Sequence, residues 1–185
     1  MGETLLDPQT AAADGQRLFA EEQYEEAAKQ FAHARRAFVE AGDDLKAGEM
    51  LNNLGVVYRR AGKHKEAAKA LEEARETFAR LGDQRREAQV LGNLGGLYSK
   101  MKRYDEAEAR FQAAFDVFEE LDDRVRQSET LRAMAIMQFK RGQRSKAMAT
   151  YEDALYFLPN LNFLQRLTRV LLKIRYFLLR LSPFR

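Results

Sequence analysis

Apolar side chains recur along this chain at the spacing of amphipathic helices, and polar residues fill most of the positions between them. Leu51, Leu54 and Tyr58 lie three and four residues apart, so a helix would place them on one face. Alternating runs of β-branched residues, which would predict strands, do not occur in the sequence. The chain is therefore predicted to be all-α. The predicted helices span residues 10–21, 24–41, 44–61, 64–81, 84–101, 104–121, 124–141, 144–158 and 161–181.

Glycine and aspartate residues indicate where these helices end and begin. Gly42 and Gly82 occur where a helix is expected to stop, and glycine is favoured there because it adopts a left-handed backbone conformation. Each glycine is followed by an aspartate, Asp43 or Asp83, whose carboxylate can cap the first N–H groups of the next helix. Such short turns predict that neighbouring helices run antiparallel.

The pattern of apolar and small residues repeats with a period of forty residues. Residues 51–58, Leu-Asn-Asn-Leu-Gly-Val-Val-Tyr, return at 91–98 as Leu-Gly-Asn-Leu-Gly-Gly-Leu-Tyr. Each copy has an alanine twelve residues after its Leu-Gly glycine, at Ala67 or Ala107, and we expect these alanines to be buried where two helices cross. One helical pair cannot bury such a face alone, so a fixed long period predicts stacked repeats. Equivalent residues continue the frame upstream at Gly15, Ala27 and Phe31 and downstream at Ala135, Ala147 and Tyr151.

The repeated motif Leu-x-x-Leu-Gly-x-x-Tyr, followed by an alanine and then a large apolar residue, resembles the tetratricopeptide repeat (TPR). Leu51 and Leu91 occupy the tryptophan position of that repeat, and Pro159 occupies its terminal proline position in the fourth copy. The forty-residue period is similar to the lengthened repeats of kinesin light chains and of bacterial TPR regulators. The resemblance implies a right-handed TPR superhelix, an α-solenoid, whose four helix-turn-helix repeats span residues 10–159.

The first and fourth copies depart from the motif. Asp14 stands where the first copy should have leucine, and Met134, Ala135 and Gln138 replace the leucine, glycine and tyrosine of the fourth. Terminal repeats of a solenoid are expected to differ, because each has a neighbour on one side only.

Two asparagines occupy the same position in the two inner copies. Asn53 and Asn93 both precede the Leu-Gly pair, and the resemblance to TPR proteins implies that this position faces a concave groove. An asparagine there can hydrogen-bond both the N–H and the C=O of an extended peptide. The alternative is that both amides are merely solvated.

A row of basic residues accompanies the asparagines. Arg60, Lys100 and Lys140 are equivalent at the forty-residue period, Arg59 is adjacent to the first, and Arg132 faces the same groove by analogy. Such cations favour an acidic segment or a C-terminal carboxylate. A solvated basic surface is the alternative, and the dicarboxylate clamp of chaperone-binding TPR proteins is not reproduced.

Residues with catalytic or metal-binding chemistry are scarce. The only histidines, His33 and His64, lack the spacing of a helical zinc site, and there is no cysteine. Gly92, Gly95 and Gly96 are not preceded by a predicted strand, so they do not form a phosphate-binding loop. We therefore expect no enzymatic activity, no cofactor, no metal site and no nucleic-acid partner.

The C-terminal residues differ in charge from the rest of the chain. After Asp153 there is no acidic residue but six basic ones, although the whole chain carries a net charge of only +3. Residues 160–185 are predicted to form a basic amphipathic helix outside the repeats, whereas residues 1–9 are expected to be frayed. The longest apolar run of the predicted C-terminal helix, residues 176–179, is far too short to span a membrane. Four basic residues share one stripe of this helix: Arg166, Arg169, Lys173 and Arg180.

The sequence therefore predicts a non-catalytic scaffold or adaptor that binds a peptide segment of a partner protein in the concave groove. The alternative is a membrane-surface or self-assembly module that acts through the C-terminal helix, which would lie on an anionic membrane or form a homodimer. A third interpretation is that this helix only caps the last repeat. The absence of cysteine agrees with a reducing compartment, so we expect a cytoplasmic protein. Peripheral membrane association is the open alternative.

Overall fold

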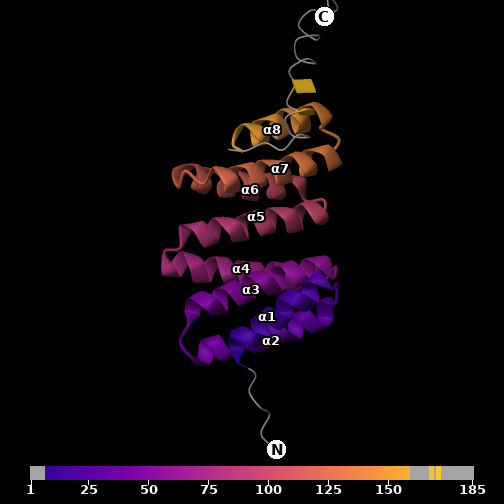
Figure 1. Ribbon diagram of the computed structural model, residues 1–185. Coiled ribbons are helices and arrows are strands. Elements are labelled where there is room, and N and C mark those ends of the chain that lie inside the picture. The colour runs from indigo at the N-terminus through magenta and orange to yellow at the C-terminus, as the bar shows by residue number, and fades with distance from the viewer. Residues whose placement is uncertain (1–6, 159–166, 169, 172–185) are drawn as a thin grey trace, which may run out of the picture. The chain divides into compact units, whose positions relative to one another are not determined.

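The computed structural model describes residues 7–158, 167–168 and 170–171, and every regular element in this part of the chain is an α-helix (Figure 1). The all-α prediction is confirmed, and the predicted ends of the first eight helices agree with the structure to within two residues. The helices are α1 (Pro8–Ala20), α2 (Tyr24–Glu40), α3 (Asp44–Arg60), α4 (His64–Leu81), α5 (Gln84–Lys100), α6 (Tyr104–Glu120), α7 (Arg124–Lys140) and α8 (Arg144–Tyr156).

The turns between helices share one backbone device. A residue with positive φ closes each turn, and the twenty-residue interval between these residues sets the length of the helices. The aspartates predicted as N-caps act as such, because Asp43 accepts a hydrogen bond from the backbone N–H of Lys46 and Asp83 from that of Arg86. The residues with positive φ are Glu22, Gly42, Gly62, Gly82, Lys102, Asp122 and Gly142.

The chain forms two compact units, Met1–Ala114 and Phe115–Arg185, with the division inside α6. In the first unit α1 packs against α2, α2 against α3, α3 against α4 and α4 against α5. The first helices of the two inner repeats, α3 and α5, also contact each other. The first two repeats are therefore antiparallel helical pairs, and each packs against the pair that follows it.

Small residues let the two helices of each pair approach closely. Ala67 and Ala107 are fully buried, as predicted. Gly55 lies directly against Leu71, and an added Cβ there would overlap the leucine side chain. A Cβ at Gly95 would lie 2.8 Å from Cδ1 of Phe111, which is tighter than real contacts. The glycine of the motif is therefore required by packing against the large apolar residue of the second helix.

The second unit has a more polar interior. Helices α7 and α8 pack together, and the buried Ser128 hydroxyl donates a hydrogen bond to the backbone oxygen of Ala154 at 2.8 Å. Gln138, which replaces the tyrosine of the motif, is only 1% exposed, and its amide atoms have no hydrogen-bond partner among the described residues. Burial of an unpaired amide is unfavourable, so we expect the core of the fourth copy to be less stable than the cores of the inner copies.

Most of the predicted C-terminal helix lies outside the described residues, including Arg166, Arg169, Lys173 and Arg180. The described residues 167–168 and 170–171 are helical. Leu167 and Leu171 are 44% and 56% exposed, and Phe139 on α7 is 60% exposed.

Among the described helices, none combines the length and the hydropathy that crossing a membrane requires.

The glycine contacts predict opposite effects of the same substitution. Gly55→Ala should overpack the contact with Leu71 and lower the free energy of unfolding by about 1–3 kcal/mol, partly offset by higher helix propensity. Gly92→Ala is the matched control, because nothing lies within 4 Å of an added Cβ there, and it should stabilise by about 0.5–1 kcal/mol. Urea unfolding of both variants measures the difference. Equal stabilisation by both would mean that Gly55 does not lie at a helix crossing.

Candidate functional site

The first helices of successive repeats in residues 7–114 contribute side chains to one surface, which we call the first-helix face. This face contains a hollow of about 260 Å³. Because the side chains that line it come from α1, α3 and α5, with one from α4, a ligand there would meet three repeats at once. The lining residues are Gln16, Glu49, Met50, Asn52, Asn53, Phe78, Arg86 and Gln89.

Half of the side chains that line the hollow are amides: Gln16, Asn52, Asn53 and Gln89. Asn93 donates a hydrogen bond from Nδ2 to Oδ1 of Asn52 at 2.8 Å, which links α5 to α3. Asn53, the repeat equivalent of Asn93, lines the hollow. The forty-residue period did not identify Asn52, because its equivalent in the next copy is Gly92. This hydrogen bond uses one N–H of Asn93 and the oxygen of Asn52. The NH2 group of Asn52 and the oxygen of Asn93 therefore remain for a ligand.

Three charged residues beside the hollow, Arg86, Glu49 and Asp83, interact with one another. Arg86 on α5 donates a hydrogen bond from Nε to Oε1 of Glu49 on α3 at 2.9 Å and one from Nη1 to Oδ2 of Asp83 at 2.6 Å. Its Nη2 lies in ion-pair contact with the same Glu49 oxygen at 2.8 Å. Burial raises the pKa of Asp83, but the hydrogen bonds and charge of Arg86 lower it by more, so the pKa lies below its ordinary value. Arg86 is therefore already neutralised within the protein and ties two repeats together.

The predicted basic residues have different surroundings. Arg60 and Lys100 are exposed at equivalent positions of α3 and α5, whereas Arg59 is half-buried between these two helices and contacts Gly96. None of the three forms an ion pair within the part of the chain that the structure describes. Arg132 and Lys140 are exposed on α7 and belong to the second unit.

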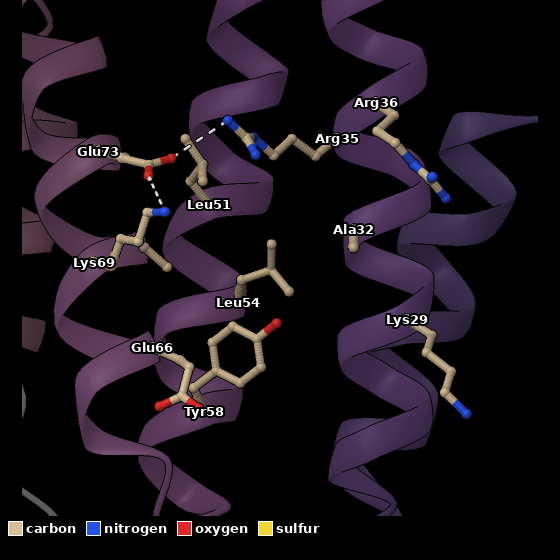
Figure 2. A pocket seen from close by; sticks show the side chains of 11 residues that line it. Lys29, Ala32, Arg35, Arg36, Leu51, Leu54, Tyr58, Glu66, Lys69 and Glu73 are labelled. Atoms are coloured by element: carbon tan, nitrogen blue, oxygen red, sulfur yellow. Dashed lines mark hydrogen bonds and ion pairs between the residues drawn. The ribbon is translucent and has the colours of Figure 1, made fainter.

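A second hollow, of about 550 Å³, lies between α2 and α4 over α3. Figure 2 shows Leu51 and Leu54 between the two helices, Arg35 directed toward Glu73, and Lys29 and Arg36 pointing away. The Arg35–Glu73 ion pair measures 3.4 Å. Its cationic side chains are therefore either paired or directed outward.

The size of this second hollow follows from two alanines. Ala32 and Ala70 line it, and their equivalents one repeat later are Glu72 and Arg110, which form an ion pair at 3.6 Å. Long charged side chains thus occupy the corresponding space between α4 and α6. The first-helix face has more groups available for a ligand, namely Asn53 and the remaining polar atoms of the Asn52–Asn93 pair.

No group of three or more histidine, cysteine, aspartate or glutamate side chains in the described ranges could hold a metal ion.

Comparisons with known proteins agree with the repeat architecture. A family model described as tetratricopeptide repeat matches residues 15–80 and 86–158, which together make up well over half of the chain. The crystal structure of BtubC (BKLC) from P. vanneervenii is similar, with a TM-score of 0.71 and 24% sequence identity. The match covers 84% of this chain and 67% of that one. No curated protein matches the sequence.

The Asp83–Arg86 pair predicts a specific dependence of stability on pH. The folded-state pKa of Asp83 is lowered, so its stabilising effect is present above the unfolded-state pKa and is lost as the pH falls through the folded-state pKa. Asp83→Asn keeps a capping side chain but not the charge. When the pH is lowered from about 7 to about 3, the free energy of unfolding of the parent protein should fall by up to about 1 kcal/mol more than that of the variant. Urea unfolding at both values tests this, and identical losses would contradict it.

Proposed function

Because the chain belongs to the tetratricopeptide repeat family, we propose that it is a non-catalytic adaptor that binds an extended peptide segment of another protein along the first-helix face. Stacked helical repeats form extended binding surfaces. The observation that carries the proposal is the hollow lined by α1, α3 and α5, with Asn53 in it and the Asn52–Asn93 pair beside it.

The amides match the chemistry of a peptide backbone. Each asparagine offers an N–H donor and a carbonyl acceptor, so one side chain can bond both polar groups of an extended residue. Helices that pack together lie roughly 8–10 Å apart, a distance that an extended peptide spans in about three residues. Asn53 on α3 and Asn93 on α5 would therefore bond residues about three apart in one peptide.

The charges on this face favour an acidic partner. Arg60 and Lys100 occupy equivalent exposed positions of α3 and α5. Glu49 is paired with Arg86, so it does not cancel their charge. The partner segment is proposed to carry aspartate or glutamate, and raised salt should weaken its binding. In the second unit Lys140 occupies the corresponding exposed position, and Arg132 is exposed on the same helix.

The competing function places the activity in residues 160–185, as a membrane-surface or self-assembly module. It is supported by six basic residues without an acid after Asp153, and by the exposure of Leu167, Val170 and Leu171. A variant with glutamine at Arg166, Arg169, Lys173 and Arg180 separates the two functions in the full-length chain.

Under the adaptor proposal this quadruple variant keeps its affinity for peptide. Under the competing function the parent protein sediments with anionic vesicles or forms dimers, and the variant loses one of these properties. Vesicle co-sedimentation with anionic and neutral lipid, together with light scattering, measures both outcomes.

The adaptor proposal predicts that the amides contribute to affinity. For a peptide selected from a displayed random library against the full-length chain, the double variant Asn53→Ala/Asn93→Ala should bind on the order of tenfold more weakly, through lost hydrogen bonds. Gln112→Ala, which removes an exposed amide on the second helix α6, is the control and should bind normally. Calorimetric titration measures the affinities, and an unchanged double variant would exclude these amides from the site.

A further inference from the structure

Arg59 differs from the other half-buried arginines of residues 7–114. Four of these arginines have a carboxylate within ion-pair distance: Arg35, Arg75, Arg86 and Arg110 pair with Glu73, Glu72, Glu49 and Glu72 at 3.4, 2.8, 2.8 and 3.6 Å. Arg59 has no such partner among the described residues. Its Nε atom is buried and makes no hydrogen bond to any described group.

An unpaired guanidinium in this position is unfavourable. Burial and then the neighbouring charge of Arg60 hold the pKa of Arg59 below its ordinary value. A partly desolvated cation gains more from an anion than a fully hydrated one does, because part of its hydration is already lost. An incoming carboxylate would therefore meet a donor that the fold has desolvated in advance.

Gly96 provides the space that Arg59 occupies. A Cβ at Gly96 would overlap Nη1 of Arg59. The repeat itself does not require glycine at this position, because the equivalent residues in the other copies are Gln16, Val56 and Ile136. The residues equivalent to Arg59 are Phe19, Ser99 and Phe139, so the pairing of arginine with glycine occurs only between the second and third copies.

We propose that Arg59 is the anchor for one carboxylate of the bound segment, from an acidic side chain or a C-terminus, and that Gly96 leaves the space for its guanidinium. The proposal rests on peptide binding at the first-helix face. The Asn52–Asn93 hydrogen bond joins the same two helices, α3 and α5, so the anchor and the amides act on one segment. A carboxylate is favoured over a phosphate, because phosphate recognition uses clusters of arginines and Arg59 has only Arg60 beside it.

The first test uses a small anion and needs no peptide. In the full-length chain, the Nε–H resonance of Arg59, assigned by its loss in Arg59→Lys, should shift on titration with sodium acetate. Titration with acetamide, at ionic strength matched by sodium chloride, should leave it unchanged. The exposed Arg60 is the internal reference and should respond less. An acetate response no larger than that of Arg60 would overturn the anchor.

The second test uses a peptide selected from the displayed library. We expect one acidic residue, or the free C-terminus, to matter: its replacement by the corresponding amide, or C-terminal amidation, should weaken binding about tenfold. In Arg59→Gln the acid and amide forms should bind equally. Gly96→Ala, which displaces the guanidinium, should also reduce the discrimination, whereas Gly92→Ala on the same helix should retain it.

The outcomes separate the anchor from the general function. If the peptide binds and Arg59→Gln still discriminates between acid and amide, the anchor is wrong and the adaptor function stands. If no selected peptide depends on the first-helix face, the adaptor function fails, and the acetate titration decides independently whether Arg59 binds a carboxylate.

Discussion

The close contact between the glycine of each first helix and the large apolar residue of the second is the constraint on which the repeats depend. Leu71 packs onto Gly55 and Phe111 onto Gly95, while Ala67 and Ala107 are fully buried beside them. With the helices this close, their remaining apolar residues form a core that continues from one pair to the next. The same close approach aligns α3 and α5, so that residues at equivalent positions reach one common surface.

The helices and their ends could be predicted from the sequence because local chemistry determines them. Asp43 and Asp83 cap helices, and Gly42 and Gly82 adopt the left-handed conformation that ends them. The turn at Lys102 has the same positive φ without a glycine, so the helical period rather than residue type located it. Packing was predictable for the same reason, since each buried alanine follows its glycine at a fixed interval.

The chemistry of the first-helix face was less predictable, because a period identifies positions that are alike. It selected Asn53 and Asn93, but the hydrogen bond joins Asn93 to Asn52, whose equivalent is a glycine. Likewise Arg59 could be identified as a basic residue, but whether a described carboxylate lies within ion-pair distance of it depends on side chains from other helices. Residues that differ from their equivalents in the other copies, such as Asn52 and Arg59, are not explained by the packing of the repeat, so they are the first candidates for functional tests.

The central claim is that the first-helix face of residues 7–114 binds a partner segment, and mapping the bound peptide tests it most directly. Backbone and side-chain amide resonances of the isotopically labelled full-length chain would be followed during titration with a selected peptide. If the partner segment binds this face, the largest shifts should occur in α3 and α5, at the side-chain amides of Asn52, Asn53 and Asn93. Shifts confined to the second helices α2 and α4, or to residues 159–185, would contradict it.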